Sequence, residues 1–169
     1  LSTGTAGTLG YYGSLSGGGS LTLSSGTSLT ALKIVSGTIV IGAAGTLNLT
    51  NGGLLSVSSG SSVIMGGSLR VATAGADLVV NQFGSGALVI ASTIADNGST
   101  ALTKNGFGTL VLAGSNRFAG PVYLNQGSLQ IAGSQALGVT SSAALNFNGG
   151  TLAITSGTNS SRAISLGAA

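Results

Sequence analysis

The feature that most constrains the fold is a pair of apolar residues separated by one residue, which recurs along the chain and often follows glycine. Two clear copies are Gly108–Leu112 (Gly-Thr-Leu-Val-Leu) and Gly127–Ile131 (Gly-Ser-Leu-Gln-Ile). Alternating apolar positions are typical of a β-strand with one buried face, and no helical i, i+3, i+4 pattern is sustained. The apolar pairs are Leu21/Leu23, Ile39/Ile41, Leu47/Leu49, Leu55/Val57, Leu69/Val71, Leu78/Val80, Leu88/Ile90, Leu110/Leu112, Val122/Leu124, Leu129/Ile131, Leu145/Phe147, Leu152/Ile154 and Ile164/Leu166.

The glycines that precede these pairs also repeat at longer range. The interval from Gly37 to Gly60 and the interval from Gly86 to Gly108 have almost the same length, in the low twenties. A period of that length that holds three short strands is what one coil of a parallel β-helix requires. The sequence therefore predicts an all-β fold: a single parallel β-helix segment over residues 1–169, with three-strand coils of about 22–23 residues stacked at the inter-strand spacing of about 4.8 Å.

Stacking of coils assigns a role to each type of residue. Inward Leu, Ile and Val form apolar columns, and outward Thr, Ser and Asn form polar columns that can hydrogen-bond along the stack. Glycine provides positive φ at the corners. We expect helix content close to nil, and in the two clearest copies we expect Leu110, Leu112, Leu129 and Ile131 to be buried, with Val111 and Gln130 facing outward.

Two groups of polar or aromatic residues have both a structural and a binding interpretation. Tyr11 and Tyr12 are adjacent, and they indicate an exposed contact patch or, as we favour, an end rung or lateral packing point. Asparagines recur at or near predicted turns, where left-handed conformations and side-chain ladders are a better explanation than ligand binding. These asparagines are Asn51, Asn81, Asn105, Asn116, Asn125 and Asn148.

Charge and hydropathy exclude two classes of partner. No apolar run approaches the roughly 18–20 residues of a membrane-spanning helix, so we expect no membrane span in this segment. Nucleic-acid binding requires clustered cations that neutralise several phosphates, and none is expected here. The five cations are scattered along the chain, at Lys33, Arg70, Lys104, Arg117 and Arg162.

The residues needed for catalysis are almost absent. The chain has no His, Cys or Glu, which removes Ser-His-Asp and Cys-His arrangements and zinc sites. Asp77 and Asp96 are the only carboxylates, and their spacing is near one coil length, so they could be neighbours on one face. A glycosidase needs two carboxylates at a defined separation, but turn roles explain both residues better, since Asp96 precedes Asn-Gly. We therefore expect no enzyme activity and no catalytic, cofactor-binding or metal-binding residues.

Lys104 precedes a Gly-x-Gly-Thr-Leu strand at Gly106, Gly108, Thr109 and Leu110, and a Gly-x-Asn-x-aromatic-x-Gly motif follows at Gly114, Asn116, Phe118 and Gly120. Asn125, Gly127 and Leu129 then form Asn-x-Gly-x-Leu, and Ala136, Leu137 and Gly138 close the stretch. In these motifs, residues 94–138 resemble the passenger-associated transport repeat of bacterial autotransporters, although Pro121 replaces the small or hydroxyl residue that is usual after Gly120. The resemblance implies a right-handed parallel β-helix within a longer secreted passenger, exported across the outer membrane by type V secretion and located at the surface of a Gram-negative bacterium or outside the cell. The absence of an initiator Met before Leu1 agrees with a piece of a longer chain.

Three functions remain open at this point. The first is a structural or adhesive β-helical segment, acting as a rigid stalk or a multivalent surface that contacts host surfaces or polysaccharides, with coils stacking on neighbouring coils. The alternative is a subunit of a self-assembling extracellular filament or sheath, because neither Leu1–Ser20 nor Ile164–Ala169 has the pattern of a cap. The third, a carbohydrate-active β-helix, is disfavoured by the two isolated carboxylates.

Overall fold

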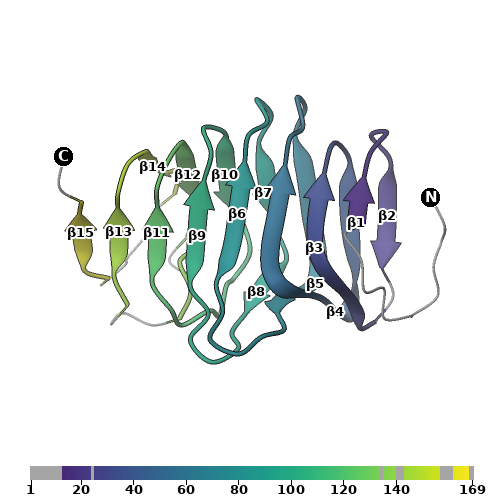
Figure 1. Cartoon of the computed structure of the whole chain (residues 1–169), viewed down its shortest axis with the longest axis horizontal. Helices are drawn as coiled ribbons and strands as arrows, with labels where there is room; N and C mark the ends of the chain where they lie inside the picture. Colours follow the sequence, from purple (N-terminus) through teal and green to yellow (C-terminus); the bar gives the residue numbers. More distant parts are fainter. Residues whose placement is uncertain (1–12, 24, 134, 140–142, 157–161, 168–169) are drawn as a thin grey trace.

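The protein was analysed as a computed structural model that describes residues 13–23, 25–133, 135–139, 143–156 and 162–167. These residues form a parallel β-solenoid in which every paired strand runs parallel to its neighbours (Figure 1). The described residues contain no helix. The all-β parallel fold expected from the sequence is therefore confirmed. Tyr11 and Tyr12 lie outside the described residues.

The strands form three faces of the solenoid, and the strands β3 (Thr27–Ile34), β4 (Thr38–Ser56) and β5 (Ser62–Val71) bend around corners to contribute to more than one face. Face A stacks β2 (Ser20–Leu23), β4, β5, β7 (Leu88–Ile90), β10 (Thr109–Leu112), β12 (Ser128–Ile131) and β14 (Thr151–Ile154). Face B stacks parts of β3, β4 and β5 with β8 (Thr93–Ala95). Face C stacks β1 (Gly13–Leu15), β3, β4, β6 (Leu78–Gln82), β9 (Leu102–Asn105), β11 (Val122–Leu124), β13 (Leu145–Phe147) and β15 (Ile164–Leu166).

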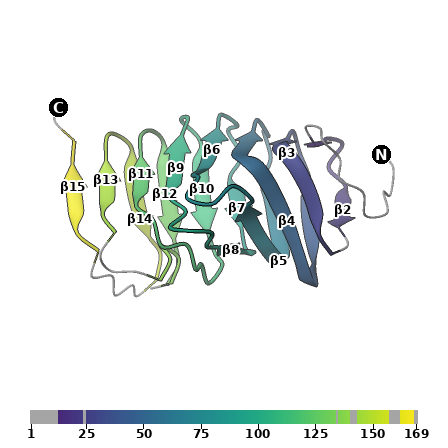
Figure 2. The ribbon, with the colours of Figure 1, turned by 60° about the horizontal axis from the view of Figure 1, so that its bottom comes forward.

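Face C positions most of the outward side chains that form the candidate functional site. Figures 1 and 2 both show its strands side by side along the long axis, from β15 near the C terminus to β3 near the N terminus. Its outer surface is turned toward the viewer in Figure 1. Each strand except those at the two ends is paired on both sides, so the backbone hydrogen-bonding groups of this face are occupied.

The core consists of apolar columns that follow the strand register. Leu110 stacks on Leu88 in one neighbouring strand and on Leu129 in the other. Leu110, Leu112, Leu129 and Ile131 are all buried, which confirms the predicted inward positions. Val111 and Gln130 alternate with them and are partly exposed on the outer surface of face A. Each coil thus buries one side of its strands against the same continuous core.

Coil length varies more than the glycine spacing predicts. Residues that pair in register mark the start and end of one coil. The coils from Ile39 to Ile64 and from Ile64 to Ile90 are longer than expected. The coil from Ile90 to Leu112 has the expected length, whereas the coil from Leu112 to Ile131 is shorter. The predicted length thus falls within the observed range, and the corner loops absorb the differences.

Three strands per coil are present up to Asn105, but face B has no strand after β8 among the described residues. In the next coil, Ala113–Pro121 crosses this side without forming a strand, although Asn116 and Phe118 in it are buried. This coil belongs to the sequence that resembles the transport repeat. Its third side is held by side chains together with isolated backbone hydrogen bonds, such as that from the N–H of Arg117 to the carbonyl of Ile94 over 2.9 Å, instead of a full strand ladder.

The predicted inward pair Leu55/Val57 is wrong by one residue. Leu54 and Ser56 are buried, whereas Leu55 is partly exposed and Val57 is 39% exposed. Leu54 is in register with Leu32 and Val80, which are both buried, so the neighbouring columns fix the register. Because side chains alternate with period two, a shift of one residue moves the whole pair to the other face.

The last two predicted pairs lie in the final described coil and are largely exposed. Leu152 is partly buried, but Ile154, Ile164 and Leu166 are 57%, 64% and 77% exposed. β14 and β15 each pair with one strand only among the described residues. Their exposure follows from this one-sided pairing, and burial does not alternate along either strand.

Candidate functional site

Asparagine side chains form a ladder on the outer surface of face C. Asn105 donates from Nδ2 to Oδ1 of Asn81 over 3.2 Å, Asn125 donates to Asn105 over 2.8 Å, and Asn148 donates to Asn125 over 2.7 Å. The sequence-based prediction of side-chain ladders is confirmed for these four residues. The prediction of left-handed turn conformations is wrong, because Ser99 is the only non-glycine residue with positive φ in the described part of the chain.

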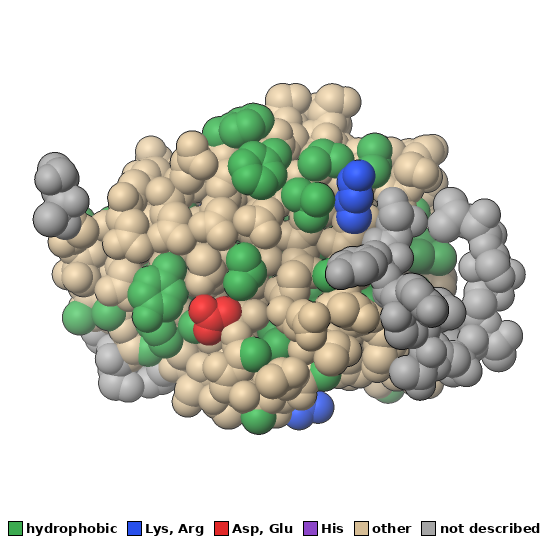
Figure 3. All heavy atoms as spheres, in the orientation of Figure 1, with side chains coloured by type: hydrophobic (Ala, Val, Ile, Leu, Met, Phe, Trp, Pro, Cys, Tyr) green, Lys and Arg blue, Asp and Glu red, His purple; other side chains and the backbone are tan. Residues whose placement is uncertain are grey.

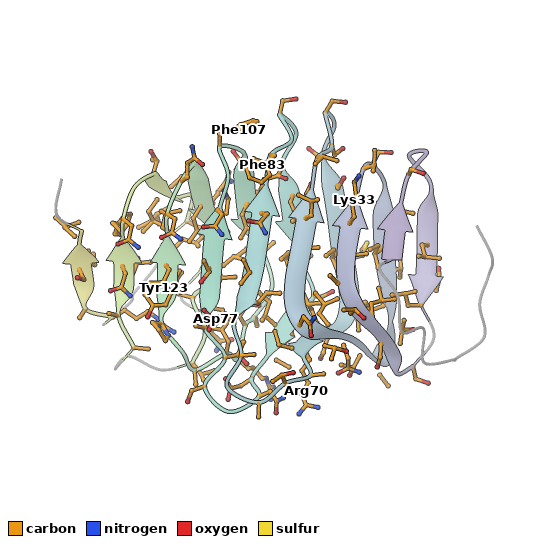
Figure 4. The ribbon with its side chains drawn as sticks, in the orientation of Figure 1. Lys33, Arg70, Asp77, Phe83, Phe107 and Tyr123 are labelled. Atoms are coloured by element: carbon orange, nitrogen blue, oxygen red, sulfur yellow. The ribbon has the colours of Figure 1, made fainter. Side chains whose placement is uncertain are left out.

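Two phenylalanines project from the corner that follows face C. Phe83 comes directly after β6, and Phe107 lies two residues after the end of β9. Their rings meet edge to face with centroids 5.9 Å apart. They are 45% and 63% exposed, and Val57 occupies the equivalent corner position after β4. Figure 4 shows the two rings together at the upper edge of the molecule, and Figure 3 shows apolar side chains gathered there. We call Val57, Phe83 and Phe107 the aromatic corner.

A shallow groove of about 330 Å³ lies beside the ladder, toward the N-terminal end of face C. Its floor is formed where the outward positions are occupied by Ala31 and Gly53, which are in register on β3 and β4. Lys33, Leu55 and Asn81 contribute to its lining. Figure 4 shows Lys33 on β3 on the same side of the molecule as the aromatic corner. The groove thus exists because two small side chains lie between larger ones.

The lower part of face C carries further polar groups. Asp77 precedes β6, and its Oδ2 accepts a hydrogen bond of 3.3 Å from Oγ1 of Thr103. Tyr123 on β11 is in register with Thr103 and is partly exposed (Figure 4). We refer to the asparagine ladder, the aromatic corner, the groove and Tyr123 together as the face C surface. It combines amide donors and acceptors with apolar and aromatic groups.

Asp96 has a structural role in the turn after β8. Its carboxylate accepts hydrogen bonds from the backbone N–H groups of Ser99, Thr100 and Ala119, over 3.1, 3.0 and 2.9 Å. Burial raises the pKa of this carboxyl, but the backbone N–H donors outweigh burial and hold the pKa below its ordinary value. Since Ala119 belongs to the next coil, Asp96 fixes a turn and links two coils. The structure does not bring its carboxylate into a hydrogen-bonded pair with Asp77.

Lys104 is a fully buried cation in the motif that resembles the transport repeat. Its Nζ donates to the carbonyl oxygens of Asn105, Gly106 and Gln126, over 2.9, 2.6 and 3.1 Å. The three N–H groups of the ammonium are thereby used, and Gln126 lies one coil further on. Burial lowers the pKa of Lys104 to about 8.

Asn116, Phe118 and Arg162 complete a buried polar clamp beneath face B. Asn116 accepts from the backbone N–H of Ile94 and donates to the carbonyl of Ala136, so it connects three successive coils. The Arg162 guanidinium lies 5.7 Å from the centroid of the Phe118 ring and donates to backbone carbonyls, including that of Ala143 over 2.8 Å. Burial lowers the pKa of Arg162. These side chains replace backbone partners that a third strand provides elsewhere.

The sequence interpretation missed the aromatic corner and the groove. A signal for the corner exists, because Asn81 and Asn105 are each followed two residues later by a Phe-Gly pair, one coil apart. A signal for the groove is the small residues Ala31 and Gly53 at the same coil position. Neither signal was recognisable before the register was known. Within the described residues there is no helix that is long and apolar enough to cross a membrane, and no group of three His, Cys, Asp or Glu residues that could hold a metal ion.

Comparison with known proteins gives a family match and one curated relative. Residues 102–131 match the family described as the Passenger-associated-transport-repeat. The adhesin BmaC autotransporter of Brucella suis biovar 1 (strain 1330) is 39% identical over 82 residues, which cover 48% of this chain and 2% of that protein. The chain therefore matches only a very small part of the length of this relative. No solved structure matches the chain. The repeat, the relative and the parallel solenoid all fit a segment of an autotransporter passenger, which implies a location at the surface of a Gram-negative bacterium or outside the cell.

Proposed function

We propose that residues 1–169 form one adhesive, non-enzymatic β-helical segment of a surface protein, and that the face C surface is its multivalent contact area. The observation that carries this proposal is the aromatic corner beside the asparagine ladder. A stalk alone needs no large apolar side chains in solvent, yet Phe83 and Phe107 are 45% and 63% exposed. Exposed aromatic groups on a rigid scaffold are typical of residues that contribute most to binding energy.

The ladder supports the same proposal because it fixes the polar groups of the surface. Asn105 and Asn125 each donate one amide hydrogen bond and accept another, so their side chains are held in place before any ligand arrives. Preorganised groups lose less conformational entropy on binding. Stacked coils repeat the same groups along the solenoid, which favours simultaneous weak contacts with an extended partner. The name of the Brucella relative, an adhesin, agrees with this use of the fold.

A non-enzymatic role is part of the proposal. The carboxylate of Asp96 is occupied by three backbone N–H groups, and Asp77 is partnered with Thr103. Neither arrangement provides a pair of carboxylates on either side of a substrate bond. Incubation with a panel of polysaccharides should release no shorter products. Release that is abolished by Asp77→Asn would contradict this part of the proposal.

The contact area can be tested with two matched variants. The double variant Phe83→Ser/Phe107→Ser should weaken binding of the chain to immobilised host-cell surfaces or polysaccharides by about tenfold or more, since truncation of an aromatic anchor typically costs about 2 kcal/mol or more. Met65→Ser is the control, because Met65 is 43% exposed on β5 and faces out from a different side. Equal binding by the double variant, the control and the unsubstituted chain would contradict the proposed location.

A second candidate function is assembly into a filament through the final described coil. The observation that favours it is the exposure of Ile154, Ile164 and Leu166, together with the one-sided pairing of β14 and β15. A further coil of a longer chain would cover the same groups. Electron microscopy of purified protein at rising concentration should show filaments if copies stack on each other, and persistent monomers would exclude this candidate.

A further inference from the structure

The asparagine ladder has a direction, and its donor end lies at the groove. Each Nδ2 donates to the Oδ1 of the asparagine in the preceding coil, from Asn148 through Asn125 and Asn105 to Asn81. At the next position in the register, Asn81 is paired with Leu55, whose side chain has no acceptor. Nδ2 of Asn81 therefore has no acceptor among the described residues. Because hydrogen bonds in a chain polarise one another, this terminal amide is a strong donor.

A second donor lies on the other side of Leu55. Lys33 is in register with Leu55, so Lys33, Leu55 and Asn81 occupy one outward column on three adjacent strands. At the usual spacing of neighbouring strands, the backbones of Lys33 and Asn81 are about 10 Å apart. Lys33 is exposed and makes no ion pair within the described part of the chain. The lining of the groove is thus mostly apolar, and it includes parts of Lys33 and Asn81 on either side of Leu55.

No acid within the groove neutralises Lys33. Neither Asp77 nor Asp96 is among the residues that line it. Asp77 lies at the opposite end of β6 from Asn81, which at about 3.3 Å per residue places the two backbones roughly 13 Å apart. A mostly apolar groove bordered by one cation and one amide donor is complementary to a ligand that has an apolar face, a negative charge and further acceptor groups.

We infer that this groove binds a carboxylate-bearing saccharide unit, such as a uronic acid within a polysaccharide. The carboxylate pairs with Nζ of Lys33, a hydroxyl or ring oxygen accepts from Nδ2 of Asn81, and the C–H face of the sugar packs on Leu55 and the floor of Ala31 and Gly53. This inference rests on the proposed contact role of the face C surface and names a ligand class for one part of it. The volume of about 330 Å³ is near the lower end of small-ligand sites, roughly 300–1,000 Å³, so it suits a short section of a longer chain.

A saccharide fits these features better than other polymers do. An extended peptide that adds to a sheet needs a free strand edge, but β3, β4 and β6 are paired on both sides. Nucleic acid needs several clustered cations, whereas Lys33 is the one cation in the lining of the groove. Saccharide hydroxyls accept as well as donate hydrogen bonds, which suits an amide donor beside an apolar surface.

Calorimetric titration with tetragalacturonate and with its methyl ester tests the inference. The acid should bind, and the ester should bind about tenfold more weakly or worse, because esterification removes the charge that pairs with Lys33. Lys33→Ala should weaken binding of the acid by about tenfold, and Lys33→Arg should restore most of it. Asn81→Asp should also weaken it, because that change keeps an oxygen for Asn105 and replaces the donor by a negative group. Arg117→Ala, at an exposed cation outside the groove, should bind like the unsubstituted chain.

Several outcomes would overturn the inference. Equal affinity for the acid and the ester would remove the role of charge, and unchanged binding by Lys33→Ala would place the site elsewhere. Equal affinity for tetraglutamate would show simple attraction of any polyanion. Failure of this inference is distinguishable from failure of the proposed function: host-surface binding that depends on Phe83 and Phe107 but not on Lys33 leaves the contact role intact. Uronate binding in the groove without any host-surface binding supports the groove and contradicts the wider contact role.

Discussion

The coils before Asn105 and the coil of the transport repeat differ in how their backbone N–H and C=O groups find hydrogen-bond partners. In the earlier coils, β4 alone runs from Thr38 to Ser56 through all three faces, and its neighbours pair with it along most of that length. In the repeat, face B has no described strand, and buried side chains take up backbone groups. Asn116 links Ile94 to Ala136, and Lys104 links carbonyls of two coils.

The difference shows what the residues of the repeat motif do. A buried backbone N–H or C=O without a partner costs about as much as a lost hydrogen bond. A regular ladder satisfies these groups without specifying particular side chains, so the strands of the early coils need only alternating apolar residues. Where the ladder stops, some backbone groups still pair with each other, and others, such as the N–H of Ile94 and the carbonyl of Ala136, pair with a particular side chain at a particular position. The repeat is therefore recognisable as a sequence string because part of its strand pairing is replaced by contacts of individual side chains.

The largest expected effect is that of removing the ring at the centre of the clamp. Phe118→Ala should lower the free energy of unfolding by about 3–5 kcal/mol, because Phe118 is fully buried and its ring packs against Arg162. Phe107→Ala removes the same atoms from a residue that is 63% exposed and should change stability by about 1 kcal/mol or less. Chemical denaturation followed by circular dichroism measures both. Similar losses in the two variants would contradict the clamp as the source of stability.

A smaller effect is expected when the coil-linking amide is removed. Asn116→Ala leaves the buried N–H of Ile94 and the C=O of Ala136 without partners, at a cost of about 2–4 kcal/mol. Asn125→Ala removes an asparagine that also makes two amide contacts, but on the partly exposed ladder, and should cost about 1 kcal/mol. Comparison of the unfolding midpoints of the two variants tests whether Asn116 of the clamp contributes more to stability than Asn125 of the ladder. A larger loss for the ladder variant would reverse the ranking.

The stability of the coils before Asn105 depends on the glycines at their corners. Gly66 has φ of +76°, and a Cβ there would lie 2.1 Å from the carbonyl oxygen of Ile41 in the preceding coil. Gly66→Ala should therefore destabilise the fold by about 2–3 kcal/mol through strain and displaced stacking. Gly26→Ala has a similar φ of +78° but meets nothing within 4 Å, so only the conformational cost of about 1 kcal/mol applies. Thermal unfolding of the Gly66→Ala and Gly26→Ala variants separates the cost of the steric contact with the preceding coil from the cost of backbone strain. Equal melting temperatures would show that the preceding coil does not restrict the side chain at position 66.

The sequence predicts the fold well because every coil repeats the same alternation of inward apolar residues and outward residues. Alternation alone places Leu110, Leu112, Leu129 and Ile131 in the core, since each residue meets the same kind of neighbour in both adjacent coils. It fails at Leu54 and Leu55, where two leucines are adjacent and only the columns on the neighbouring strands decide which one is inward.

The face C surface is much less predictable from sequence. The asparagine ladder follows from turn residues that recur one coil apart, and it could be foreseen. The groove depends on which of Ala31, Lys33, Gly53 and Leu55 share a register and a direction, because it is defined by small side chains between larger ones. The burial of Lys104 also needs coordinates, because a single lysine in an otherwise neutral segment indicates an exposed side chain on composition alone.

The pH dependence of stability tests the burial of the Lys104 ammonium in the repeat. Burial lowers the pKa of Lys104 to about 8 in the folded state, and unfolding returns it to its ordinary value of 10.5. Between these two values the unfolded chain binds more protons, so the contribution of Lys104 to stability is least favourable below about pH 8 and improves as pH rises toward 10.5. The difference in unfolding free energy between the unsubstituted chain and Lys104→Met should therefore change across that window, in the direction that favours the unsubstituted chain at higher pH. A difference that does not change between about pH 8 and pH 10.5 would show that the Lys104 ammonium is not desolvated in the fold.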